Sequence, residues 1–200
     1  MSAREEILDR VRRGAAAIGT SLTPPTLPRF DAPAPAWDSF CAAVERMGGK
    51  VAPRPEGMSL ADHLRALHPA AAVIVSATPE VAGTRALAEV RAPAELEDVD
   101  VGIVRARFGV CETGSVLLTE AELGIEALGF LAQHLVVLLD PGALLASVHD
   151  AYADPTFASA RYQILMTGPS ATADIEGVLI HGAQGIRSLT VVPVAAAAPP

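Results

Sequence analysis

The stretch A-A-V-I-V-S, residues Ala71–Ser76, is one of two apolar runs that decide the fold class of this 200-residue chain. The second run is H-L-V-V-L-L, residues His134–Leu139. Neither run alternates apolar with polar residues, and such runs are typical of strands buried on both faces of a parallel sheet. Segments with helical spacing separate them along the chain. The sequence therefore predicts an α/β fold in which helices cover both faces of a mostly parallel sheet.

Predicted strands and helices alternate on either side of these runs. Further strands are expected at Lys50–Pro53, Val99–Val104, Tyr162–Thr167 and Arg187–Val194. Helices are expected at Ala36–Met47, Leu60–Leu67, Pro79–Val90, Pro141–Tyr152 and Ala173–His181. The apolar segment Leu123–Leu131 fits either type of element. Between Arg107 and Glu120, the pattern predicts two extended segments around a sharp turn at Thr113–Gly114.

The two ends of the chain differ in composition from its centre. Ser2 and Glu5 match a capping box, and the apolar residues after them recur at helical spacing, which predicts an amphipathic N-terminal helix. Thr23–Pro35 contains five prolines and is expected to be an extended arm. We therefore divide the chain into a helix and proline-rich arm (1–35), an α/β domain (36–194) and a disordered tail (195–200).

The charge balance argues against nucleic acid as a partner. Fifteen basic and 23 acidic residues give a net charge of −8, and Lys50 is the single lysine. Phosphate binding needs clustered positive charge, which the sequence lacks.

No apolar run approaches the ~18 residues of a membrane span, and the first residues do not form a secretory signal. We expect a cytoplasmic protein without a membrane span.

The cysteines and histidines do not predict a metal centre. Cys41 and Cys111 are too few for a disulfide framework or for an iron–sulfur cluster, which needs about four thiolates. The five histidines lack metal-type spacing. We therefore expect no metal site and no cofactor in this chain.

One candidate ligand site is the segment Gly168–Glu176, G-P-S-A-T-A-D-I-E, between a predicted strand and a predicted helix. Such a turn offers backbone N–H groups and a positive helix end to an anion, and Ser170 and Thr172 add hydroxyl donors. The alternative is local: either hydroxyl caps the helix, while Asp174 and Glu176 complement its dipole. His181 and Arg187, further along the chain, could face the same cleft.

The second candidate is Glu112, which precedes Thr113 and Gly114 at the end of a predicted strand. A carboxylate in this place could act as a general base or as a nucleophile, and Gly114 would let a ligand approach closely. The alternative is a solvated turn residue, because turns commonly carry Glu, Thr and Gly for local reasons. Both interpretations stay open at this point.

G-V-C-E-T-G-S-V-L-L at Gly109–Leu118 and G-P-S-A-T-A-D-I-E-G-V-L-I-H-G-A-Q-G-I-R-S-L-T-V-V at Gly168–Val192 resemble the two signatures of the LUD-domain family. Within it, the chain is most similar to the lactate utilization protein C group. The resemblance covers about Lys50–Val194 and implies a sandwich like that of the NagB/RpiA/CoA-transferase group.

The same resemblance implies a function: an accessory subunit that helps oxidise L-lactate to pyruvate with two iron–sulfur partner proteins, which carry the clusters. The residues that match the signatures are Glu112, Thr113, Gly114, Gly168, Ser170, Thr172, Asp174, Glu176 and Arg187. The chain departs from the pattern at Ala171, Gln184 and Ile186, where the family commonly has Arg, His and Pro. The lost Arg and His would remove an anion contact and a proton-transfer group.

Three hypotheses follow. The first is an accessory subunit of a lactate-oxidising system, with a small-anion cleft that the two signatures form at the carboxyl edge of the sheet. The second is a stand-alone transferase or hydrolase that uses Glu112 as nucleophile or base, by analogy with CoA transferases. The third is an assembly module that docks through residues 1–35 onto a partner or a second copy, which makes a homo-oligomer an expected form.

Overall fold

The chain divides into two units, Met1–Asp31 and Ala32–Pro200, each described here by itself. The computed structural model describes residues 2–18, 31–173, 178, 180–182 and 184–196. In the first unit, helix α1 (Ala3–Ile18) begins with the predicted capping box, because Ser2 and Glu5 exchange backbone-to-side-chain hydrogen bonds. Most of the proline-rich arm and the end of the tail lie outside the described residues. Among the described helices, none is both long and apolar enough to cross a membrane.

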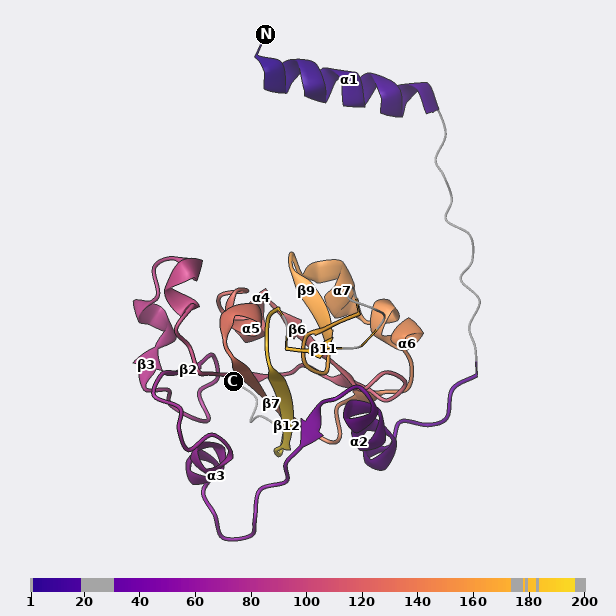
Figure 1. Ribbon diagram of the computed structural model, residues 1–200. Coiled ribbons are helices and arrows are strands. Elements are labelled where there is room, and N and C mark those ends of the chain that lie inside the picture. The colour runs from indigo at the N-terminus through magenta and orange to yellow at the C-terminus, as the bar shows by residue number, and fades with distance from the viewer. Residues whose placement is uncertain (1, 19–30, 174–177, 179, 183, 197–200) are drawn as a thin grey trace. The chain divides into compact units, whose positions relative to one another are not determined.

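Six parallel strands form the main sheet of the second unit, in the order β1-β12-β7-β4-β2-β3 (Figure 1). Their bounds are β1 (Lys50–Val51), β12 (Ser188–Pro193), β7 (His134–Leu139), β4 (Val101–Arg105), β2 (Ile74–Ser76) and β3 (Arg85–Ala86). β7 and β12 pair in parallel along their whole length, from His134 opposite Ser188 to Leu139 opposite Pro193. The parallel sheet predicted from the two apolar runs is confirmed.

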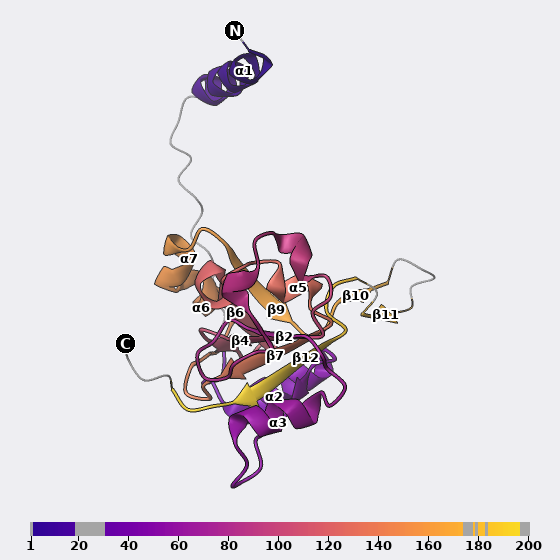
Figure 2. The same cartoon turned by 90° about the vertical axis from the view of Figure 1, so that its left-hand side faces the viewer.

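A second, mixed sheet packs on the first and has the strand order β8-β5-β6-β9. Its bounds are β8 (Leu144–Leu145), β5 (Gly109–Val110), β6 (Ser115–Thr119) and β9 (Gln163–Thr167). β5 and β6 are the two extended segments predicted around Thr113–Gly114, and they pair antiparallel. Two further short strands, β10 (Ala171–Thr172) and β11 (Ile180–His181), form an antiparallel pair that projects from the two sheets in Figure 2.

The helices are short and cap or cover these sheets. Their bounds are α2 (Trp37–Arg46), α3 (Leu60–Leu67), α4 (Glu120–Leu123), α5 (Leu128–Leu131), α6 (Val148–Ala153), α7 (Pro155–Ser159) and the 3₁₀ helices η1 (Leu87–Glu89) and η2 (Pro93–Leu96). α3 has the predicted bounds, and the Ser59 hydroxyl accepts a hydrogen bond from Asp62 N at its start.

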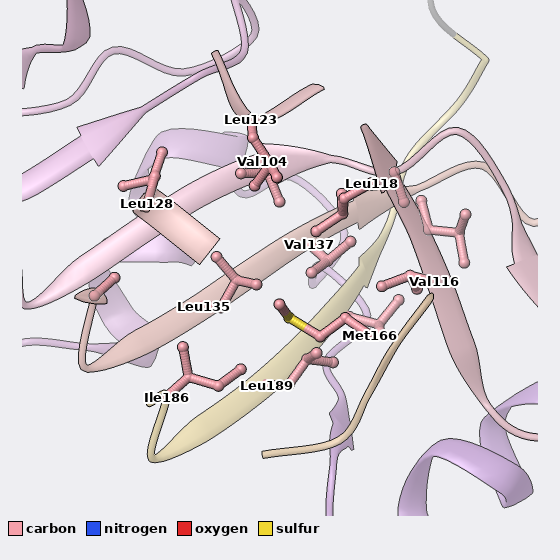
Figure 3. Packing of buried hydrophobic residues seen from close by; sticks show 14 of the residues in the cluster. Val104, Val116, Leu118, Leu123, Leu128, Leu135, Val137, Met166, Ile186 and Leu189 are labelled. Carbon is pink, nitrogen blue, oxygen red and sulfur yellow. The ribbon is translucent and has the colours of Figure 1, made fainter. Parts of the chain in front are cut away.

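Three apolar clusters hold the layers together. The largest lies between the two sheets and includes α2 residues Phe40 and Val44; Figure 3 shows its centre around Val137 and Met166. A second cluster joins the other face of the main sheet to α3, and a third joins the second sheet to α6 and α7. Successive residues of β7 point into different clusters, Leu135 and Val137 into the first and Val136 and Leu138 into the second. The α/β sandwich is confirmed, with a second sheet covering one face of the parallel sheet.

The helix predicted at Pro79–Val90 is wrong. Thr84 instead binds the end of the main sheet: its N donates to Ile74 O (2.8 Å), and its hydroxyl accepts from Ile74 N (2.8 Å). These bonds bring the next two residues into the parallel strand β3 beside β2. Only the 3₁₀ turn η1 follows, because pairing with the sheet replaces the helical hydrogen bonds.

The helix predicted at Pro141–Tyr152 is also wrong in its first half. Asp140 accepts hydrogen bonds from Gly142 N and Ala143 N, which closes a turn after β7. The chain then forms β8 and enters α6 at Val148, where Ser147 and Asp150 make a capping box. The helix therefore begins at the capping box of Ser147 and not at Pro141.

The helix predicted at Ala173–His181 is wrong where the structure describes it. Thr172 lies in β10 rather than at a helix cap, and Ile180 and His181 form β11. Ala173 and Val178 belong to no helix. The other two predicted site residues in this segment, Asp174 and Glu176, lie outside the described residues.

Candidate functional site

A cleft of about 550 Å³ opens at the carboxyl edge of the main sheet. Its lining residues follow the ends of three parallel strands: Thr78 after β2, Arg105 and Arg107 at and after β4, and Asp140 after β7. The carboxyl edge of an open parallel sheet is where such folds commonly bind ligands. None of the signature residues that the structure describes lines this cleft.

Five charged side chains are among the described residues that line the carboxyl-edge cleft. Arg105 pairs with Glu80 and also donates from Nη2 to Ala195 O (3.2 Å). Arg107 donates from Nε (3.2 Å) and Nη2 (2.9 Å) to Glu122. Among the bonds within the described residues, neither guanidinium uses Nη1, so each keeps donors for a ligand.

Thr78 supplies an unused polar group to the same cleft. Its side chain is only 8% exposed, and its Oγ1 has no hydrogen-bond partner among the described residues. Its backbone N and O are both bonded to the Ser76 hydroxyl, which fixes the turn after β2. A buried hydroxyl without a partner is costly, and a ligand that accepts or donates there would remove the cost.

Glu112 lies in the turn between β5 and β6, away from the residues that line the carboxyl-edge cleft. Its carboxylate accepts a hydrogen bond from Val148 N (2.9 Å), the first residue of α6. Its backbone is held as well, since its N donates to Ala146 O and its O accepts from Arg46. This exposed carboxylate thus binds the start of a helix, and its catalytic role remains a prediction.

The Thr113 hydroxyl belongs to a chain of three hydroxyls. Thr113 Oγ1 lies 2.6 Å from Ser115 Oγ, which in turn lies 2.5 Å from Thr167 Oγ1. Ser115 is buried, and the chain ties the turn after β5 to the end of β9. The structure thereby brings the first signature together with the start of the second.

Gly114 and Gly168 lie beside the end of α2. Both have a positive φ, +67° and +62°. A Cβ on Gly114 would collide with the α2 backbone, and a Cβ on Gly168 would collide with the backbone of Met47, the residue that follows α2. The two signatures therefore meet at this helix, with Glu112, Thr113, Gly114 and Gly168 close together.

The second signature continues along the amino edge of the main sheet, opposite to the edge that we expected. Ser170 N donates to Ile186 O (3.0 Å), just before β12, and Arg187 N donates to Gln133 O (2.7 Å), just before β7. Gly168 and Ser170 line a second hollow, of about 470 Å³, beside strand β9. We call this hollow the β9 groove; Ala171, Gln184 and Ile186, the three departures from the family pattern, also line it.

A pair of histidines adds to this amino edge. The rings of His68 and His134 stack with their centroids 4.7 Å apart, and His134 Nδ1 lies 2.8 Å from Ser188 Oγ. Burial lowers the pKa of both imidazoles, and the charge of Lys50 lowers both further. Arg187 also lowers the pKa of His134, whereas Asp100 raises it. No cluster of three potential metal ligands occurs among the described residues.

Sequence reasoning expected a cleft at the carboxyl edge but missed the residues that line it. The available signal was the position of Arg105 and Arg107, directly after a strand that was correctly predicted. Asp140 gave the same signal after β7, because parallel strands bring their carboxyl ends together. The sequence could not point to Thr78, because the burial of its hydroxyl without a partner among the described residues depends on how the folded chain packs.

A parallel sheet packed on a mixed sheet, with a cleft at its carboxyl edge, defines this chain as an α/β sandwich protein. The family model of the LUD domain matches residues 60–194, and the chain belongs to this family. No curated protein compared with the chain matches it. A solved structure, a DUF162 family protein from Deinococcus radiodurans, shares the fold with a TM-score of 0.58 at 18% identity, over 79% of this chain and 95% of that one.

Proposed function

We propose that this chain is an accessory subunit of a cytoplasmic system that oxidises L-lactate to pyruvate together with two iron–sulfur partner proteins. The observation that carries the proposal is membership in the LUD domain family, which is associated with lactate utilization. The resemblance to the lactate utilization protein C group supports the finer role. The iron–sulfur clusters of the partners would accept the electrons.

In this proposal the carboxyl-edge cleft holds a small anion. A hydroxy acid offers a carboxylate to the free donors of Arg105 or Arg107 and a hydroxyl to Thr78. Three carboxylates (Glu80, Glu122, Asp140) and two guanidiniums line the cleft, and two of the carboxylates pair with the guanidiniums. A polyphosphate would bring several negative charges to this lining, so a small monoanion fits the cleft better than a polyphosphate does.

The competing proposal of a stand-alone transferase is not favoured. It required Glu112 as nucleophile or base beside the ligand. The Glu112 carboxylate instead accepts a hydrogen bond from the start of α6 and is absent from the lining of the carboxyl-edge cleft.

The test is lactate-dependent dye reduction with the two partner proteins purified from the same source. The reaction is run without this chain, with wild-type protein, with Arg107→Gln and with Arg91→Gln, a control at an exposed arginine outside the cleft. We expect full activity with wild type and the control, and a roughly tenfold or greater loss with Arg107→Gln, equivalent to ~1.4 kcal/mol. Unchanged activity without the chain would contradict the lactate role; unchanged activity of Arg107→Gln alone would contradict the cleft assignment.

A further inference from the structure

Strand β9 is an edge strand without the usual protection. It forms one side of the second sheet, and its backbone hydrogen bonds within the described residues go to β6 alone. An edge strand presents unpaired N–H and C=O groups, and proteins commonly protect such edges with charged side chains, prolines or short length. The sequence of β9, Q-I-L-M-T, has five residues and contains neither a charge nor a proline.

The other sheet edges differ from β9. The main sheet ends in β1 and β3, which have two residues each and begin with Lys50 and Arg85. The far edge of the second sheet, β8, also has only two residues. Short edges, two of them carrying a basic side chain, resist pairing with another chain. β9 is therefore the edge that is suited to accept a strand.

The β9 groove runs beside this edge, and the described residues that line it carry no charge. Four consecutive strand residues, Ile164–Thr167, line it together with Phe130 and Ile186. The carboxyl-edge cleft, by contrast, carries five charged side chains. An uncharged groove beside unpaired backbone groups fits an extended apolar strand and does not fit an anion.

Exposed apolar side chains gather around the groove. Of the six large apolar side chains that are exposed in the described part of the α/β unit, Phe130 lines the groove, Leu131 follows it in α5, and Met47 lies beside the lining residue Gly168. Val178 and Ile180 lie just before and within β11, the strand that pairs with β10. Concentrated exposed apolar surface is typical of a protein–protein contact. The sixth, Tyr152, lies on α6.

We propose that the occupant is β9 of a second copy of this chain, so that two protomers join their second sheets into one continuous sheet. Antiparallel pairing about Leu165 places Ile164 opposite Met166 of the other protomer and Gln163 opposite Thr167. Every facing pair is then uncharged and matched in polarity, which avoids the cost of like charges across strands. The contact is self-complementary, as a twofold interface requires, and the β9 groove receives apolar side chains from both copies.

The first test is hydrogen exchange followed by mass spectrometry on the full chain at low and high protein concentration, with molar mass measured by light scattering. We expect a molar mass of twice 20.6 kDa at high concentration, with slower exchange in Tyr162–Gly168 that disappears on dilution. Exchange at the edge strand β1 serves as the internal control and stays unchanged. A monomer at all concentrations, or a dimer without protection of β9, would overturn the proposal.

Two variants complete the test. Phe130→Glu places a charge at the rim of the β9 groove, where the side chain is 37% exposed, so folding should survive while the dimer is lost. Ile7→Glu is the matched control on α1, where the side chain is 63% exposed, and it should leave the dimer intact. If Ile7→Glu gives the monomer and Phe130→Glu does not, helix α1 mediates self-association and the β9 interface is wrong.

Discussion

Gly114 and Gly168 lie against the same end of helix α2, although 54 positions separate them in the chain. A Cβ on Gly114 would lie 2.4 Å from Val44 N, and a Cβ on Gly168 would lie 2.2 Å from Met47 O. Each distance is far shorter than a van der Waals contact. The glycines of both family signatures therefore allow two loops to pack on one helix.

This packing predicts the effect of alanine at the two positions. Gly57 has a similar φ of +77° but nothing within 4 Å of its Cβ position, so Gly57→Ala isolates the backbone strain, which costs about 1–3 kcal/mol. Gly114→Ala and Gly168→Ala add the collision with α2 and should reduce the free energy of unfolding by more than Gly57→Ala does. Urea unfolding measures all three, and equal losses would show that the contact with α2 is unimportant.

The hydrogen bond from Val148 N to Glu112 predicts a structural role for this carboxylate. Glu112→Ala removes the acceptor at the start of α6 and should reduce the free energy of unfolding by about 0.5–2 kcal/mol. Glu112→Gln keeps an acceptor and should cost less. Thermal and urea unfolding check the order, and lactate-dependent dye reduction with the partners should stay unchanged for Glu112→Gln. A folded Glu112→Gln protein without activity would restore the catalytic interpretation.

Removal of the Thr78 hydroxyl should affect protein stability differently from removal of an ordinary buried hydroxyl. Because its Oγ1 is buried without a partner among the residues that the structure describes, Thr78→Val should leave the stability of the ligand-free protein unchanged or raise it by roughly 1 kcal/mol. Thr119 is the matched control, since its buried hydroxyl bonds Glu122 at the start of α4. Thr119→Val should lose about 1–2 kcal/mol in the same urea titration. Equal losses in both variants would mean that Thr78 has a partner.

The stacked histidines predict a dependence of stability on pH. The pKa values of His68 and His134 lie below the ordinary 6.5 in the folded protein, so the unfolded chain binds these protons first. Their contribution is therefore complete above pH 6.5 and is lost as the pH falls from 6.5 through the folded-state values. Carboxyls with a lowered pKa, such as Asp100, lose their contribution only below their ordinary value of 3.8.

The measurement is the urea midpoint between pH 8 and pH 5 for wild type and His68→Phe. The phenyl ring keeps the stack on His134 but cannot be protonated, so the variant should lose less stability on acidification. Identical slopes would show that His68 does not titrate in this range.

The main sheet could be predicted because the residues of its central strands are themselves apolar. β7 is buried on both faces and pairs with a strand on each side, so its residues are apolar except at its start. There the polar side chain of His134 forms a hydrogen bond with Ser188. α3 was equally clear, since Ser59 and the apolar spacing after it act locally. Local chemistry and tertiary packing agree in these elements.

The features that the sequence did not predict depend on contacts between segments that lie far apart in the chain. Leu87–Glu89 has good helix formers, yet the hydrogen bonds of Thr84 to Ile74 direct the chain into the sheet before a helix can begin. The signature around Gly168 suggested a ligand turn, whereas its glycine permits close packing on α2. The lining of the carboxyl-edge cleft escaped notice because Thr78, Arg105 and Asp140 come from the ends of three separate strands and meet only in the folded chain.

The bond from Arg105 Nη2 to Ala195 O holds the last described residues across the carboxyl edge, and Ala196 lines the cleft itself. A fluorophore attached at position 196 through an introduced cysteine would therefore sit at the mouth of the cleft, and its emission would report whether the cleft is occupied. Titration of such a labelled protein would measure an affinity directly, in the absence of partners and of turnover.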